Sequence, residues 1–155
     1  MRNTVKVVLG ALLILTGCGP ALAAGDDGGT STGTDGGTST GANNPNAKLS
    51  YIQQKILTPS CASSSCHAGG GVSISHIDLS AGKTLAAVVN TASQDPGVTA
   101  TLVVPGHPEQ SFLVMKIAGN VPSADGAAMP MVGAPLTAQQ VQDVVDWITN
   151  GAQDN

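Results

Sequence analysis

The sequence predicts an all-α domain over residues 47–151, preceded by a disordered tether. Two observations carry this prediction. The C-terminal part has a clear helical period, with Val141, Val144, Val145 and Ile148 on one side. Residues 19–46 are rich in Gly, Ser, Thr, Asp and Asn, a composition that cannot bury enough apolar surface to fold. The folded unit therefore lies in the second part of the chain.

The N-terminal residues have the pattern of an export signal. Arg2 and Lys6 precede an apolar run over residues 7–15, which is the usual order in a secretory signal. This run is too short for a permanent membrane helix, which needs about 20 residues. We therefore interpret it as a processing segment, and the chain that remains has four lysines against ten acidic residues. Such an excess of acid argues against nucleic acid as a partner.

The end of this segment, Leu15-Thr16-Gly17-Cys18, resembles the lipobox of bacterial lipoproteins. The resemblance implies a signal peptide over residues 1–17 and lipidation of Cys18, followed by a flexible linker to residue 46. Lipid chains would attach the domain to a membrane without a spanning helix. Because Gly19 follows the cysteine, the resemblance implies the outer membrane of a cell envelope. The alternative is a plain secretory signal cleaved near Ala23.

Two helices are predicted in the first half of the domain. The first covers residues 49–57, where Ile52 and Ile56 fall on one side, and Pro59 should end it or begin the next turn. The second covers residues 81–89, with Ser80 as its N-cap. The side chains that this second helix should bury are Leu85, Val88 and Val89.

A third helix is predicted over residues 108–118, because Pro108 suits a first helical position and Gly119 suits the residue after the end. A short extended run over residues 98–104 precedes it. Residues 121–135 contain three prolines and no regular period. The side chains that should face inward from the third helix are Phe112, Leu113, Met115 and Ile117.

The last predicted helix is the best defined. Thr137 is its N-cap, and Gln140 at the third helical position completes a capping box. Gly151 should end the helix, and Trp147 lies near the edge of its apolar stripe. Residues 152–155 are then a short C-terminal tail.

A cysteine motif, Cys61-Ala62-Ser63-Ser64-Ser65-Cys66-His67, follows the first predicted helix. Two thiols can each add across a vinyl group of haem, and a histidine beside the second can ligate its iron. An exported chain, however, lies in an oxidising compartment, where the same two thiols can form a disulfide. The motif by itself leaves both possibilities open.

The motif resembles the Cys-x-x-Cys-His signature of the cytochrome c family, in a variant with four residues between the cysteines. The order of parts is also similar to class I cytochromes c: a helix, the motif, further helices, a Met-Pro loop and a terminal helix. This resemblance covers residues 47–151 and implies a small helical domain wrapped around one covalent haem c. With one Trp, one Tyr and one Phe, the chain is short of the residues that usually fill a core, which favours the same interpretation.

The resemblance also implies the roles of single residues. Cys61 and Cys66 would carry the haem, His67 would be the proximal iron ligand, and Met129 in Met129-Pro130 the second one. Met131 is the next candidate, whereas Met115 should pack in the core. Ligation by His76 or His107 is a further alternative. Side chains expected to line the haem pocket are Ile77, Leu79, Leu85, Val104, Phe112, Leu136 and Val145.

The implied function is that of a monohaem lipoprotein that carries single electrons between redox partner proteins in the cell envelope. We expect no enzyme activity, because no constellation of catalytic side chains is visible. Asp78, Asp125, Asp143 and Asp146 are interpreted as helix-end or surface charges. Two alternatives stay open: a cofactor-free surface module for adhesion or assembly, stabilised by a Cys61–Cys66 disulfide, and a copper site with Cys, His and Met ligands.

Overall fold

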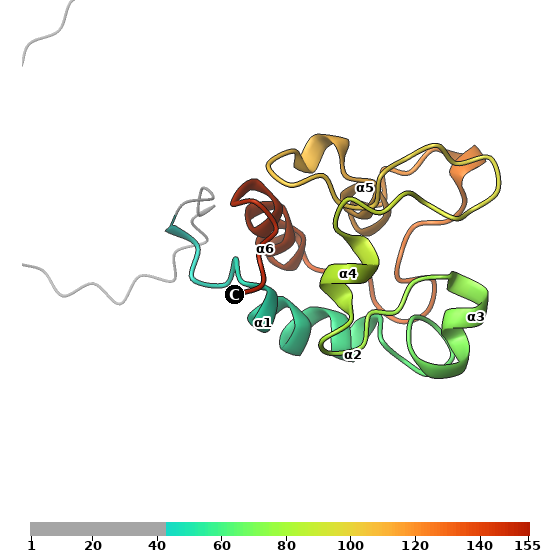
Figure 1. Cartoon of the computed structure of the whole chain (residues 1–155), viewed down its shortest axis with the longest axis horizontal. Helices are drawn as coiled ribbons and strands as arrows, with labels where there is room; N and C mark the ends of the chain where they lie inside the picture. The colour runs from blue at the N-terminus through green and yellow to red at the C-terminus, as the bar shows by residue number, and fades with distance from the viewer. Residues whose placement is uncertain (1–42) are drawn as a thin grey trace, which may run out of the picture. The chain divides into compact units, whose positions relative to one another are not determined.

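The computed structural model describes residues 43–155, and over these residues the protein is all-α, as predicted (Figure 1). Two isolated β-bridges, Val89–Val103 and Ala92–Thr101, are the extended pairings in this part of the chain, in agreement with the extended run expected before Pro105. The expected signal peptide, the lipidation site Cys18 and the tether up to residue 42 lie outside the described residues. No helix within residues 43–155 is long and apolar enough to cross a membrane.

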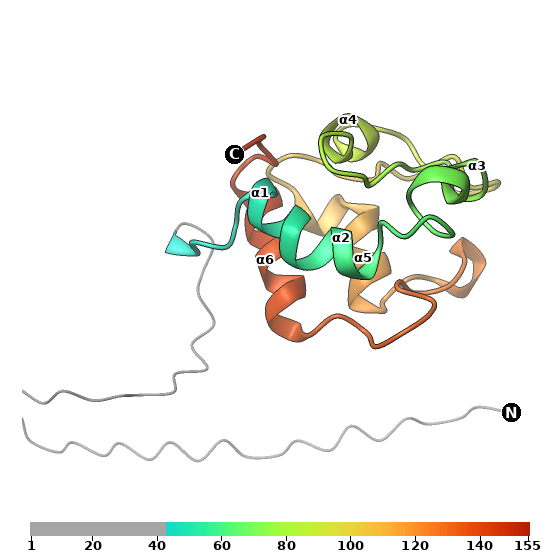
Figure 2. The same cartoon turned by 90° about the horizontal axis from the view of Figure 1, so that it is seen from below.

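The first helix is one continuous rod, on which Figure 2 labels α1 and α2, and it consists of three pieces. These are α1 (Leu49–Ile52), the π-helical turn η2 (Gln53–Leu57) and α2 (Thr58–Ser60). The predicted helix over residues 49–57 is confirmed, and Pro59 lies in the first turn of α2, which is the second of the two positions predicted for it. A proline has no N–H to donate, and the wider π-helical turn before it accommodates that loss.

The second predicted helix is shorter than expected. It is α4 (Thr84–Val88), and Lys83 rather than Ser80 occupies its N-cap position. Ser80 instead belongs to a turn, because its N–H donates to the Asp78 carboxylate at 3.0 Å and its carbonyl accepts from Lys83 at 2.9 Å. Of the side chains expected inward, Val88 is buried, whereas Leu85 and Val89 are half-buried.

A 3-10 turn and a short helix that the sequence did not predict follow the cysteine motif. They are η3 (Gly69–Gly71) and α3 (Val72–Ser75). Another 3-10 turn, η5 (Ser123–Asp125), lies in the proline-containing segment for which no regular structure was expected. The helical content of the domain is therefore spread over more and shorter pieces than the periodicity indicates.

The third predicted helix is broken in two. Pro108 begins the 3-10 turn η4 (Pro108–Gln110), and α5 (Phe112–Ala118) starts only after Ser111. The Ser111 hydroxyl causes this break, because it accepts from the Val104 N–H and donates to the His107 carbonyl, both at 2.9 Å. Gly119 ends α5 with φ +76, as predicted.

The terminal helix α6 (Ala138–Thr149) has the predicted capping box. The Gln140 N–H donates to the Thr137 hydroxyl at 3.2 Å, and the Thr137 N–H donates to the Gln140 side-chain oxygen at 2.9 Å. Trp147, expected near the edge of the apolar stripe, is 2% exposed, so the buried face of this helix reaches beyond the stripe. This helix packs against α1 and α5, and the buried core lies between these three elements.

Asp143 and Asp146 were also placed wrongly, because both are 2% exposed. The Asn44 side-chain amide donates to both carboxylates, at 2.9 and 2.7 Å. Asn44 is itself buried, so the packed structure begins before residue 47. The predicted domain boundary at residue 47 is therefore too late in the chain, and Asn44 belongs to the packed domain.

The expected tail over residues 152–155 is hydrogen-bonded to the domain, and Ala152 is buried. The Asn155 side-chain oxygen accepts from the Leu49 N–H at 2.9 Å, and the Gln153 carbonyl accepts from the Trp147 indole at 2.9 Å. Figure 1 shows the C-terminus beside α1. The N-terminus of α1 has no cap from its own Lys48, so Asn155 satisfies one of its free N–H groups.

Candidate functional site

An apolar cavity of about 350 Å³ opens beside the cysteine motif. All four predicted site residues, Cys61, Cys66, His67 and Met129, line it. The motif forms one part of the wall, and α5 and the Met-Pro segment form others. The further lining side chains used below are Asp95, Phe112, Lys116, Pro130, Met131 and Val132.

The motif itself is a closed loop of backbone hydrogen bonds. The His67 N–H donates to the Cys61 carbonyl at 3.2 Å, so the ends of the motif meet. Inside it, the Ser63 carbonyl accepts from Cys66 at 3.0 Å and from Ala68 at 3.1 Å. The four residues between the cysteines are therefore taken up by a compact turn, and both thiols still reach the same cavity.

Gly71 completes this loop from outside the motif. Its N–H donates to the carbonyls of Ser64 and Ala68, at 2.8 and 3.0 Å. A Cβ at this position would lie 2.4 Å from both the backbone N and the backbone O of Cys66. Only glycine fits so close to another backbone, so the glycine run has a packing role that composition alone did not reveal.

His67 follows the second cysteine and is half-buried. Its carbonyl accepts from the Leu79 N–H at 2.8 Å, which ties the motif to the 77–79 segment. Burial lowers the pKa of the ring, although the Ile77 carbonyl and the Asp95 carboxylate act in the opposite direction. The neutral ring is thus favoured, and this is the form that ligates metals.

The Nδ1 atom of His67 is buried and has no hydrogen-bond partner among the described residues. The Ile77 carbonyl is close enough to raise the pKa of the ring. It does not, however, accept a hydrogen bond from Nδ1. An unpaired buried nitrogen costs free energy, which makes His67 a candidate for a ligand-binding rather than a structural residue.

The two thiols differ in their surroundings, although both are free. Cys61 ends α2 and is half-buried, whereas Cys66 is exposed. Burial, followed by the charge of the Cys66 thiol, raises the pKa of Cys61 to about 11. Cys61 is therefore a protonated thiol at neutral pH, which limits its reactivity as a thiolate.

The residues predicted as candidates for a second iron ligand differ in exposure and in whether they line the cavity. Met129 and Met131 both line the cavity, but Met131 is 69% exposed and Met129 is half-buried. Met115 packs against the core, as predicted. In the described part of the chain, neither His76 nor His107 is among the residues of the cavity wall.

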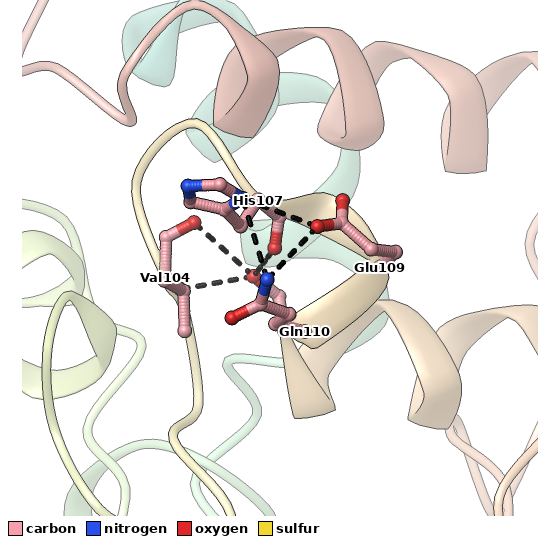
Figure 3. A network of polar contacts seen from close by, with 5 residues as sticks. Val104, His107, Glu109 and Gln110 are labelled. Atoms are coloured by element: carbon pink, nitrogen blue, oxygen red, sulfur yellow. Dashed lines mark hydrogen bonds and ion pairs between the residues drawn. The ribbon is translucent and has the colours of Figure 1, made fainter.

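His107 belongs to a separate polar network on the loop between residues 104 and 111 (Figure 3). Its Nδ1 lies 3.1 Å from the Glu109 carboxylate, and Gln110 contacts both side chains. The Glu109 pKa is lowered, first by its own backbone N–H and then by His107. His107 is thus engaged at the surface and not at the cavity.

Of the seven side chains expected to line a haem pocket, Ile77, Leu79 and Phe112 line the cavity. Leu85, Val104 and Val145 do not, and Leu136 lines a second, more open hollow. The sequence analysis missed Lys116, which is buried and part of the cavity wall. Its position four residues after Phe112, on the same face of a helix, was the available signal.

Three large apolar side chains are exposed in the described part of the chain: Ile74, Met131 and Val132, at 79%, 69% and 83%. All three line the cavity. Exposed apolar side chains that gather at one opening mark a site where a ligand or a partner covers them. Within residues 43–155, no group of three or more His, Cys, Asp or Glu side chains is arranged so that it could hold a metal ion by itself.

The chain matches no family model, no curated protein and no solved structure.

Proposed function

We propose that the domain is a monohaem c-type cytochrome that carries single electrons. The observation that carries this proposal is that Cys61, Cys66, His67 and Met129 all line the same apolar cavity. Its volume of about 350 Å³ lies within the range of cofactor sites, roughly 300–1,000 Å³. Two thiols, an imidazole and a thioether are also the donor set that haem attachment and ligation need.

The side chains of the cavity also have the chemistry that covalent attachment of haem requires. The S–H of Cys61 and of Cys66 would each add across one vinyl group, so that no oxidant is needed and no atom is lost. A protonated thiol at Cys61 agrees with such an addition. The exposed side chains Ile74, Met131 and Val132 would be covered in part by a flat apolar body in the cavity.

His67 and Met129 would hold the iron from the cavity wall. The lowered pKa of His67 keeps a lone pair on the ring at neutral pH. The Met129 thioether is a soft ligand that raises the reduction potential. When bound, the haem supplies a reversible change of one electron on its iron, and the apolar wall sets the potential at which this happens.

The location and partners belong to the same proposal. Lipidation at Cys18 would attach the protein to the outer membrane of a cell envelope, with the membrane contacted through the lipid alone. Redox partner proteins would deliver and remove the electron. We propose no enzyme activity, and steady-state conversion of a small substrate by the isolated protein would contradict this part.

The test is expression of the full chain together with a haem-attachment system for c-type cytochromes. We expect a Soret band, one haem per chain that survives denaturation in mass spectrometry, and two thioether bonds by pyridine haemochrome. Replacing both Cys61 and Cys66 by Ser should abolish the covalent haem. Cys18→Ser is the matched control, because it should remove lipid and keep the haem.

The result that refutes the proposal is equally definite. A folded protein without iron, with Cys61 and Cys66 joined to each other, would favour the cofactor-free module. Copper in place of iron in metal analysis would favour the third possibility. Met129→Ala should lower the reduction potential, whereas Met131→Ala should leave it unchanged, and the reverse outcome would assign Met131 as the ligand.

A further inference from the structure

Lys116 is a buried cation with an unusual set of partners. It lies on α5, is 8% exposed, and its Nζ is 5.0 Å from the centroid of the Phe112 ring. The same Nζ donates to the carbonyls of Asp125 at 2.7 Å and Ala127 at 3.2 Å. Burial of a charge is costly unless it is hydrogen-bonded, and here backbone carbonyls supply those bonds.

No carboxylate among the described residues forms an ion pair with Lys116, since the one ion pair there joins His107 and Glu109. Asp125 contributes its carbonyl and not its side chain. The interaction therefore depends on the path of the backbone after η5 and not on attraction between opposite charges. Gly126 makes room for it, because a Cβ there would lie 3.1 Å from the Lys116 Nζ.

The backbone of Lys116 contacts the same segment. Its carbonyl accepts from the Met129 N–H at 2.9 Å. Within the described structure, residues 126–136 make no other hydrogen bond than this one and the bond from Nζ to Ala127. We call residues 125–131 the methionine loop, and a single residue of α5 thus supplies its hydrogen-bonded attachment.

Two hollows adjoin the methionine loop. Met129 and Pro130 line both the cavity and a second, open hollow, which Leu136 and Val141 help to form. The loop is therefore not enclosed by packing alone, and its hydrogen bonds to Lys116 attach it to α5.

We propose that Lys116 is the positioning residue that keeps Met129 at the cavity by binding three backbone groups of the methionine loop. This inference rests on the proposed function, because the position of the sulfur matters when an iron is to be ligated. Losing charge-assisted hydrogen bonds releases the loop toward the second hollow. The thioether then competes less well with other ligands for the iron.

The experiment uses the haem-loaded full chain and imidazole, a ligand that competes with methionine for iron. Lys116→Leu should bind imidazole about tenfold or more tightly than the wild type, as expected for loss of one such hydrogen bond. It should also weaken the sulfur-to-iron charge-transfer band of the ferric protein. Lys116→Arg, which keeps the charge and the donors, should restore part of both signals.

Two matched controls separate positioning from charge. Lys55→Leu removes a cation from an exposed position and should leave imidazole affinity unchanged. Asp125→Asn should also have no effect, because the carbonyl and not the carboxylate binds Lys116. In a Met129→Ala background, Lys116→Leu should change the affinity by less than about twofold, since coupled residues are not additive.

If Lys116→Leu binds imidazole with the affinity of the wild type and keeps its charge-transfer band unchanged, the inference is overturned. If the wild-type protein itself carries no haem, the proposed function is refuted instead. If Lys116→Leu does not fold, Lys116→Met decides, because its side chain keeps an unbranched apolar stem and lacks the donors that bind the Asp125 and Ala127 carbonyls. Wild-type imidazole affinity and an unchanged charge-transfer band in Lys116→Met would also overturn the inference.

Discussion

Removal of the Asn44 amide should destabilise the domain, although the sequence assigns this residue to a flexible tether. In Asn44→Ala, the buried carboxylates of Asp143 and Asp146 each lose one hydrogen bond, of 2.9 and 2.7 Å. A hydrogen bond to a charged group contributes about 1.5–3 kcal/mol. Each carboxylate keeps a second donor, from Gln139 and Gln142 at 2.9 and 2.8 Å.

The expected loss in the free energy of unfolding is therefore about 2–4 kcal/mol, below the simple sum of two bonds because water enters and the remaining donors compensate. For a domain of this size that lowers Tm by roughly 4 °C per kcal/mol. Urea and thermal unfolding would measure it, with the exposed neighbour Asn43→Ala as the matched control.

Asn44→Asp is a sharper version of the same test. The side chain keeps its shape but replaces a donor by a third carboxylate next to two buried ones. It should destabilise at least as much as Asn44→Ala at neutral pH. If Asn44→Ala unfolds within about 0.5 kcal/mol of the wild type, then residues 43–46 are not part of the packed structure.

Three further predictions concern the cysteine motif. Gly71→Ala should lower the free energy of unfolding by about 3 kcal/mol, because the new Cβ would lie 2.4 Å from backbone atoms of Cys66. The control is Gly82→Ala, where φ is +77 and no atom lies within 4 Å of the new Cβ. It should lower the free energy of unfolding by only about 1 kcal/mol, and thermal unfolding would measure both. In haem-free Cys66→Ser protein, alkylation of Cys61 should keep accelerating above the ordinary thiol pKa, because burial, the larger cause of the raised Cys61 pKa, is kept in this variant. Because the folded state retains this proton more tightly than the unfolded state, stability should fall as pH rises above the ordinary thiol pKa. A rate that levels off near pH 8 would contradict this. Burial lowers the pKa of His67 in the folded state, so the unfolded state binds this proton more readily. The haem-free protein should therefore lose stability as the pH falls below about 6.5. In urea unfolding, His67→Gln should remove that part of the pH dependence.

Local signals in the sequence predicted the parts of the fold that depend on near neighbours. The capping box of Thr137 and Gln140, the apolar period of α6 and the stop at Gly119 are all formed as expected. Each depends on residues within one or two turns. Both cysteines, His67 and Met129 also line one cavity, although Met129 is far from the motif in the sequence.

The wrong predictions arise where a side chain has a partner that local rules do not consider. Ser80 should have been an N-cap, but the Asp78 carboxylate accepts from its N–H first. Pro108 should have opened an α-helix, but the Ser111 hydroxyl binds the backbone of Val104 and His107, which precede the proline. Ser and Asp side chains often form such competing hydrogen bonds to the backbone. The sequence alone does not show which of the possible hydrogen bonds will form.

Long-range polar pairs were out of reach for a different reason. Asn44 lies in a segment whose composition indicates disorder, and its partners are in the last helix. Lys116 binds carbonyls of a loop without any period, and a carbonyl is present at every residue. No pattern of residue types distinguishes such an acceptor, so neither pair could be predicted before the fold was known.

The two walls of the cavity are held by different means, and this difference has consequences for how the site fails. The motif wall is a closed set of backbone hydrogen bonds with Gly71 packed against it, so it resists changes in single side chains. The methionine loop has two hydrogen bonds from the Lys116 side chain, and Met129 and Pro130 also line a second hollow. If the domain carries the proposed haem, substitutions of Lys116 should change ligation and potential while the covalent haem is kept. Under the same proposal, substitutions at Gly71 should reduce folding and haem attachment together, because the geometry of both thiols depends on that loop.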